Sequence, residues 1–155
     1  MYIRRDGFYP GVENYLKFVK EGDVVLNIGS HIGLEAMVFG KIIGPEGRLY
    51  LFEPYEVSRN ILIKNLYIND LDDIATVYPI AASNQKTTAY LMVAFSNTGG
   101  SNVETTESLK RKNINEHMFN EKREISVDTV DNVLPKDLKA NFAFIDVQWL
   151  DVECL

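Results

Sequence analysis

Short apolar segments alternate with amphipathic ones along this chain, and this alternation restricts the fold more than any other feature. Residues 24–28, 48–54 and 141–147 (VVLNI, RLYLFEP and NFAFIDV) are apolar and rich in β-branched and aromatic residues, which is typical of buried strands. Residues 33–43 and 56–69 have a helical period. Strand–helix–strand units are right-handed and produce a parallel sheet covered by helices. The sequence therefore predicts an α/β fold.

The remaining elements are predicted by the same rules. Within residues 56–69 we expect Val57, Ile61, Leu62 and Leu66 to face inward. No repeat or linker marks a second domain, so we expect one domain over residues 1–155. The other predicted elements are a helix over 10–20, strands over 75–83, 87–95 and 122–130, a loop over 96–102, a polar segment over 104–123 and a short helix over 128–134.

Composition excludes several classes of protein. The net charge of −6 argues against general nucleic-acid binding. The single cysteine, Cys154, allows neither a disulfide framework nor a cysteine-based zinc site, which favours a reducing compartment. No segment reaches the roughly 18 consecutive apolar residues of a membrane-spanning helix, and the N-terminus has no signal-peptide pattern. We expect a cytoplasmic protein without a membrane partner.

Two glycines, Gly29 and Gly33, lie in the turn between the first strand and the next helix. Glycine lets the backbone turn sharply and approach a ligand closely, and the helix N-terminus offers free N–H groups. The spacing is neither that of a dinucleotide-binding turn nor that of a phosphate-binding loop. Many tight turns that bind nothing have the same two glycines, so a purely structural role stays open.

Glu53 ends the next strand and strengthens the case for a ligand. A carboxylate at that position can accept two hydrogen bonds from a ribose diol. Alternatively, Glu53 caps the helix that starts near Glu56. Ligands of open parallel sheets bind beyond the carboxyl ends of the strands. Four segments are predicted to meet there: 27–33, 53–55, 81–84 and 146–149.

Five segments in order carry a resemblance to a known family: GDVVLNIGSHIG, GPEGRLYLFEP, ILIKNLYIND, AAS and FAFIDVQWLDVECL. Over about residues 8–155 the chain resembles class I S-adenosylmethionine-dependent methyltransferases, and the FkbM family in particular. The resemblance implies a Rossmann-like fold with a mostly parallel sheet and flanking helices. It also implies transfer of a methyl group from S-adenosylmethionine, usually to an oxygen, with a hydroxyl of a small molecule or glycan as acceptor.

The resemblance implies roles for matching positions around this cofactor. The first-strand turn would wrap the methionine part, the end of the second strand would bind the ribose hydroxyls, and further positions would flank the adenine. The implied binding residues are Asn27, Gly29, Ser30, His31 and Gly33 for the methionine part, Glu53 for the ribose, Tyr55, Ala82 and Ser83 for the adenine, and Asp146 beside the methyl donor.

Methyl transfer requires alignment of the reactants, exclusion of water and a base for an acceptor hydroxyl. Asp146 is the candidate catalytic residue, as base or orienter, although a strand-end aspartate can equally cap the following helix. His31 is a second candidate base because histidine titrates near neutral pH. His31 and His117 are far apart and lack companion ligands, so no metal site is expected.

The chain departs from the family pattern at three places. Asn27 replaces an acid, and the loss of charge predicts weaker cofactor binding. Gln148 and Trp149 replace an acid and a glycine, and the tryptophan could stack on an acceptor or block the pocket. The sequence stops at Leu155, before the C-terminal strands of the full fold. The strand that carries Asp146 would then be an exposed edge, which invites another copy or a partner chain.

Three other readings compete with a methyltransferase that acts on a hydroxyl. Asn27, Gln148 and Trp149 favour a degenerate relative that serves as a binding or scaffolding module. The glycine spacing disfavours an NAD-linked dehydrogenase. Basic clusters at 110–112 and 122–123 would suit a nucleic-acid methyltransferase, but interleaved glutamates favour a solvated face instead.

Overall fold

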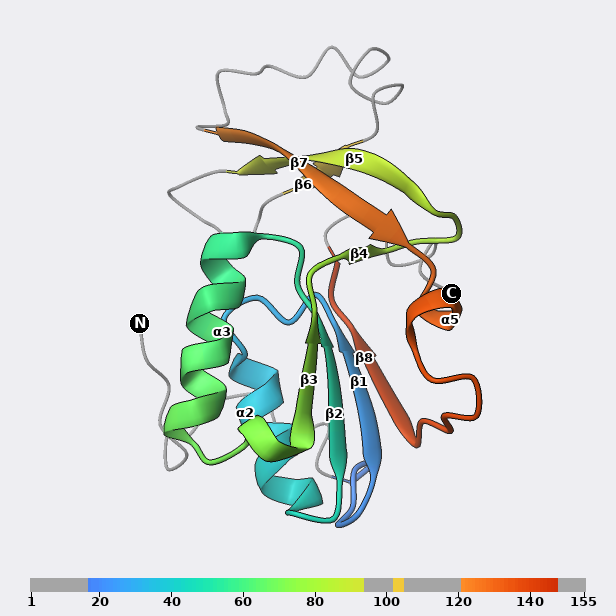
Figure 1. Ribbon diagram of the computed structural model, residues 1–155. Coiled ribbons are helices and arrows are strands. Elements are labelled where there is room, and N and C mark those ends of the chain that lie inside the picture. Colours follow the sequence, from blue (N-terminus) through green and yellow to red (C-terminus); the bar gives the residue numbers. More distant parts are fainter. Residues whose placement is uncertain (1–16, 94–101, 105–120, 148–155) are drawn as a thin grey trace.

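The computed structural model describes residues 17–93, 102–104 and 121–147 (Figure 1). Most of the helix predicted over 10–20 lies outside these residues. So do most of the glycine-rich loop, most of the polar segment, and Gln148 and Trp149. The helices of the described part are too short or too polar to cross a membrane.

Four parallel strands form the first sheet, as the sequence predicts. Their order is β3-β2-β1-β8, so β8 lies at one edge of the sheet among the described residues. The register pairs Ile28 with Phe52 and with Ile145, which brings the carboxyl ends of β1, β2 and β8 level with one another. The strands span Val24–Ile28 (β1), Arg48–Phe52 (β2), Ala75–Tyr78 (β3) and Phe142–Ile145 (β8).

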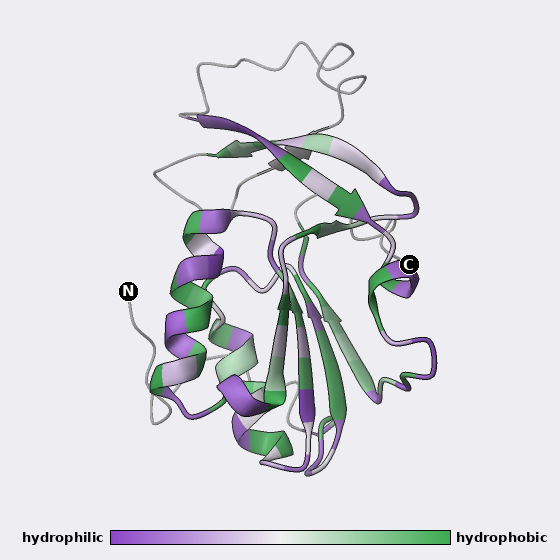
Figure 2. Cartoon of the chain, viewed as in Figure 1, coloured by the Kyte–Doolittle hydropathy of each residue, from purple (hydrophilic) through white to green (hydrophobic). Residues whose placement is uncertain are grey.

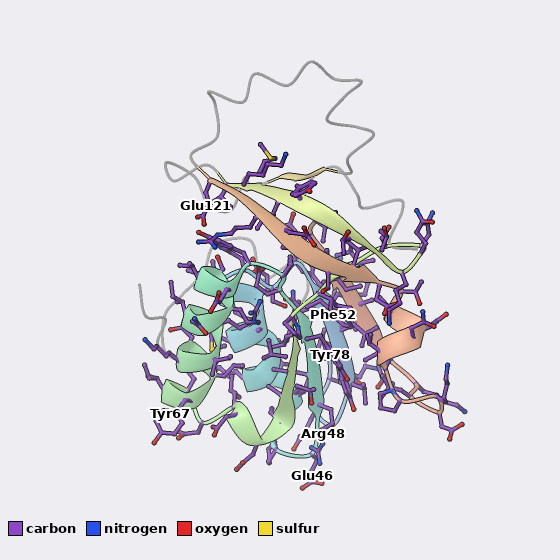
Figure 3. All side chains as sticks on the ribbon, turned by 45° about the horizontal axis from the view of Figure 1, so that its top comes forward. Glu46, Arg48, Phe52, Tyr67, Tyr78 and Glu121 are labelled. Atoms are coloured by element: carbon purple, nitrogen blue, oxygen red, sulfur yellow. The ribbon has the colours of Figure 1, made fainter. Side chains whose placement is uncertain are left out.

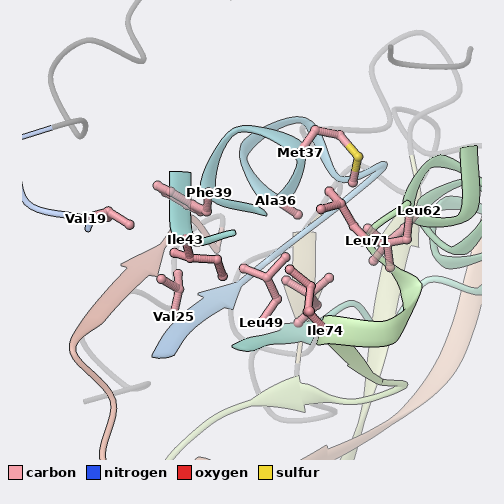
Figure 4. Packing of buried hydrophobic residues seen from close by; sticks show 12 residues of the cluster. Val19, Val25, Ala36, Met37, Phe39, Ile43, Leu49, Leu62, Leu71 and Ile74 are labelled. Carbon is pink, nitrogen blue, oxygen red and sulfur yellow. The ribbon is translucent and has the colours of Figure 1, made fainter. Parts of the chain in front are cut away.

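Helices α2 (Leu34–Ile43) and α3 (Glu56–Ile68) cover one face of this sheet (Figure 1). Their buried side chains form the main core with apolar residues of the strands, and a short 3-10 helix, η1 (Asp72–Ile74), closes it (Figure 4). Phe39 of α2 contacts Phe142 and Phe144 of β8, with ring centroids 5.5 and 5.8 Å apart. These contacts fix α2 over the β1–β8 side of the sheet.

The opposite face carries an aromatic stack and α5 (Val130–Val133). The rings of Phe52 and Tyr78 stack at 4.9 Å between centroids (Figure 3). Val130 and Val133 pack against this cluster. The strands are therefore apolar on both faces, which explains their nearly continuous hydrophobic sequences (Figure 2).

The inward face of α3 differs from the predicted one. Leu62 and Leu66 are buried as expected, but Val57 is 54% exposed. Polar residues take part of the buried face instead: the Asn65 Nδ2 donates 2.8 Å to the carbonyl of Ile32. A side-chain amide with such a partner can be buried at little cost. The prediction for Val57 was wrong because it assigned the inward face by hydropathy alone.

A second sheet lies over the carboxyl end of the first (Figure 1). Its order is β4-β7-β5-β6; β4 and β7 are parallel, and the other pairs are antiparallel. Its core includes Tyr55, which precedes α3 and so links the two sheets. The strands span Ala81–Ala82 (β4), Thr87–Val93 (β5), Asn102–Glu104 (β6) and Glu121–Asp128 (β7).

The single strand predicted over 75–83 is two strands in different sheets. Pro79 lies between β3 and β4, and a proline has no N–H group to donate to a ladder. The chain enters the second sheet through β4, whose last residue, Ala82, has Asp128 of β7 as its register partner. The backbone N–H of Ser83 donates 3.0 Å to the carbonyl of Asp128. Entry to and exit from the second sheet therefore lie side by side.

Candidate functional site

The turn after β1 is fixed against the end of β2 by backbone hydrogen bonds. The N–H groups of Gly29 and Ser30 both donate to the carbonyl of Phe52, at 3.0 and 2.9 Å. The Ser30 hydroxyl donates 2.8 Å to the carbonyl of Asn27, and the Gly33 N–H donates 2.7 Å to the carbonyl of Ser30. The turn is thus a defined loop that leads directly into α2.

Glu53 bridges this turn and the start of α3. Its Oε2 accepts the backbone N–H of His31 and its Oε1 accepts that of Tyr55, both at 2.8 Å. Burial raises the pKa of Glu53 to about 7, against the lowering effect of the two N–H groups and of Arg59. Each carboxylate oxygen can accept a second hydrogen bond. Glu53 therefore braces the turn and keeps acceptor capacity for a ligand.

Gly29 lies directly against the end of β8. Its φ of +85° is left-handed, and an added Cβ would overlap the carbonyl oxygen of Asp146. The N–H of Asp146 in turn donates 3.0 Å to the carbonyl of Ile28. Only glycine permits this approach. The structure thus brings Gly29, Glu53 and Asp146 to one edge of the sheet, which confirms that the ends of these strands meet.

Asn27 is fully buried, and among the described residues neither its Nδ2 nor its Oδ1 has a hydrogen-bond partner. Buried polar groups are nearly always paired, and an unpaired one costs about 1–3 kcal/mol. This amide lies just before the glycine turn in the sequence, and it is a candidate for contact with a ligand, directly or through water.

Three titratable groups lie together beside the turn. Burial lowers the pKa of His31, and the charge of Asp146 opposes this shift. Burial also raises the pKa of Glu35, and Asp146 raises it further. The sequence prediction included His31 and Asp146 but missed Glu35. The available signal was its position four residues before the core residue Phe39, on the same helix face.

The residues expected around an adenine are divided between two environments. Tyr55 is only 7% exposed and packs in the core of the second sheet, while its hydroxyl donates 3.1 Å to Glu121. Ala82 packs with Ile28 and Phe52 at the ends of β1 and β2. Ser83 follows it, next to Asp128. Ala82 thus lies beside the strand ends that lead to the glycine turn, Ser83 is bonded to the end of β7, and the Tyr55 ring is part of the protein core.

Comparison with known proteins gives one family and a set of solved structures. The model of the methyltransferase FkbM domain matches residues 23–153. No curated protein matches the sequence significantly.

Three solved structures are similar to the chain. An FkbM methyltransferase from Methylobacillus flagellatus has a TM-score of 0.55 and 12% identity, over 92% of this chain and 34% of that one. Fibrillarin from Aeropyrum pernix, crystallised with natively bound S-adenosyl-L-methionine, has 29% identity and a TM-score of 0.39. The match covers 43% of this chain and 27% of that one. An S-adenosylmethionine-dependent O-methyltransferase from Thermotoga maritima has 22% identity and a TM-score of 0.45, over 56% of this chain and 33% of that one. The chain spans about a third of the length of these proteins.

Proposed function

The chain belongs to the methyltransferase FkbM domain family, and from this premise we propose that it binds S-adenosylmethionine at the carboxyl edge of the first sheet. We further propose that it transfers the methyl group to a hydroxyl of a small molecule or glycan. The observation that carries the proposal is the bond between the His31 N–H and Glu53, which holds the glycine turn and the acid of the next strand together.

The residues present fit this cofactor. The bare backbone at Gly29 and the unpaired amide of Asn27 suit the amino-acid part, which carries both charges and hydrogen-bonding groups. The remaining acceptor capacity of Glu53 suits the two ribose hydroxyls. When bound, the sulfonium group of the cofactor supplies an activated methyl group. The protein then has to align the acceptor and exclude water.

Two side chains are candidates to receive the proton of an acceptor hydroxyl. Asp146 follows the end of β8 and is exposed, so an acceptor can reach it. Burial lowers the pKa of His31, which favours the neutral imidazole, the form that can accept a proton. We assign the role of base or orienter to Asp146 and keep His31 as the alternative.

Calorimetric titration tests the proposal. The chain should bind S-adenosylmethionine and S-adenosylhomocysteine, and Glu53→Ala should weaken both. The matched control Glu46→Ala removes an exposed acid at the opposite end of the sheet and should change neither affinity (Figure 3). Binding of NAD in place of both ligands would contradict the assignment.

A second candidate is a binding or scaffolding module that keeps the fold without catalysis. The uncharged Asn27 in the buried turn favours it, because a neutral amide holds a cationic group less strongly than a carboxylate does. An absence of heat with millimolar S-adenosylmethionine would favour this candidate over the enzyme.

The edge strand β8 adds a proposal about assembly. In the described part of the chain, β8 pairs only with β1, and its other edge is open to another chain. We propose that a second copy or a partner covers this edge. Light scattering at high concentration checks this, and a strictly monomeric chain would contradict self-association.

A further inference from the structure

Glu35 lies on the face of α2 that is directed toward β8. It is four residues before Phe39, which contacts Phe142 and Phe144 of that strand. Residues four apart share a helix face, and helical side chains lean toward the helix N-terminus. Glu35 therefore lies one turn closer to the carboxyl edge of the sheet than Phe39 does.

The amide of Asn27 lies on the face of the sheet that α2 covers. Asn27 is the register partner of Phe144 on β8, and partners in a parallel pair share a face of the sheet. Because Phe144 contacts Phe39, Asn27 also faces α2. A fully buried amide that has no partner in the described part of the chain thus lies on the side of the sheet toward which Glu35 leans.

Asp146 is the third member of the group that Glu35 and Asn27 begin. It comes directly after β8, and its charge acts on both Glu35 and His31. Within the described residues, neither Glu35 nor Asp146 forms a salt bridge with a lysine or arginine. Two carboxylates that repel each other beside an unpaired amide oxygen make a site that suits a cation with N–H donors.

We propose that Glu35, together with Asp146, binds the ammonium group of the amino-acid part of S-adenosylmethionine and supplies the negative charge that Asn27 lacks. This inference rests on the proposed function. The Asn27 Oδ1 serves as a neutral acceptor for the same group. Glu35 also stabilises the N-terminus of α2 as an acid in its first turn, but that role does not depend on which ligand is bound.

Two ligands that differ only in the amino-acid part separate these roles. S-adenosylhomocysteine carries the ammonium group, whereas 5′-methylthioadenosine has the same nucleoside thioether without it. Calorimetry with the native chain, Glu35→Gln and the charge-matched control Glu46→Gln measures both affinities. Glu35→Gln should weaken S-adenosylhomocysteine about tenfold and leave 5′-methylthioadenosine within about twofold, as expected for loss of one charged hydrogen bond. Glu46→Gln should change neither.

A double variant tests whether a carboxylate at position 27 can replace the one at position 35. Adding Asn27→Asp to Glu35→Gln should restore most of the lost affinity for S-adenosylhomocysteine. Equal weakening of both ligands by Glu35→Gln, or no weakening relative to Glu46→Gln, would overturn the inference while the proposed function stands. If the native chain binds neither ligand, the proposed function itself fails, and the inference falls with it.

Discussion

The backbone N–H of His31 donates a 2.8 Å hydrogen bond to the Oε2 of Glu53, across the boundary between β1 and β2. The acid expected to bind a ribose is therefore also the acid that braces the glycine turn. Loss of Glu53 should affect both the ligand and the shape of the turn. For this reason, variants of Glu53 need a measurement of stability alongside each measurement of affinity.

Glu53→Gln should change how the stability of the free chain depends on pH. The pKa of Glu53 is raised from 4.5 to about 7 in the folded chain, so the unfolded chain releases this proton first. The stabilisation is fully present below pH 4.5 and is lost as the pH rises through 7, on the order of 3 kcal/mol. Urea unfolding from pH 4.5 to 8 should show this decline for the native chain and a flatter profile for Glu53→Gln. Parallel profiles would contradict the prediction.

Gly29→Ala should be more harmful than Gly22→Ala. Both glycines have left-handed φ angles, +85° and +81°, so both variants incur a conformational cost of about 1–2 kcal/mol. A Cβ at Gly22 meets nothing within 4 Å, whereas one at Gly29 overlaps the carbonyl of Asp146. Denaturant unfolding should show an additional loss of roughly 1–3 kcal/mol for Gly29→Ala. Equal losses would mean that the contact with Asp146 relaxes freely.

Asn27→Asp should destabilise the free chain and strengthen cofactor binding. A buried carboxylate without a partner is costly, so the melting temperature of the free chain should fall at pH 8. The added charge should strengthen the bond to an ammonium group, since charge-assisted hydrogen bonds are about twice as strong as neutral ones. The shift in melting temperature caused by saturating S-adenosylhomocysteine should therefore exceed that of the native chain. A smaller shift would contradict this.

Tyr55 should act mainly as a structural link between the sheets. Tyr55→Phe removes only the hydrogen bond to Glu121, which should cost at most about 1 kcal/mol. Tyr55→Ala removes the ring from the second core and should cost about 3–5 kcal/mol. Amide exchange should then accelerate in β5 and β7 while β1 and β2 stay protected. Equal acceleration in all four strands would indicate that the sheets unfold together.

The parallel first sheet and the meeting of its strand ends could be predicted from sequence, because both follow from local patterns. The strands β1, β2 and β8 are mostly apolar, and they are followed directly by Gly29, Glu53 and Asp146. The rule that parallel strands end at one edge then places Gly29 beside Glu53 without knowledge of side-chain contacts.

The second sheet could not be predicted in the same way. β5 and β7 could be recognised as strands, but β7 pairs with β4 and β5 across long stretches of the chain, so local pattern does not reveal which strands pair. The break at Pro79 was missed because apolar residues continue on both sides of it. Glu35 was missed because a charged residue in a helix is expected to face solvent, whereas its helix face is set by Phe39.

Ala82 pairs directly with Asp128, so the segment between them leaves the first sheet and returns to it at neighbouring points. Its two ends are neighbours, so its insertion, exchange or shortening would leave the geometry of the first four parallel strands intact. In evolutionary terms the chain is modular. One part could change without altering the first sheet, where we propose that the nucleoside binds.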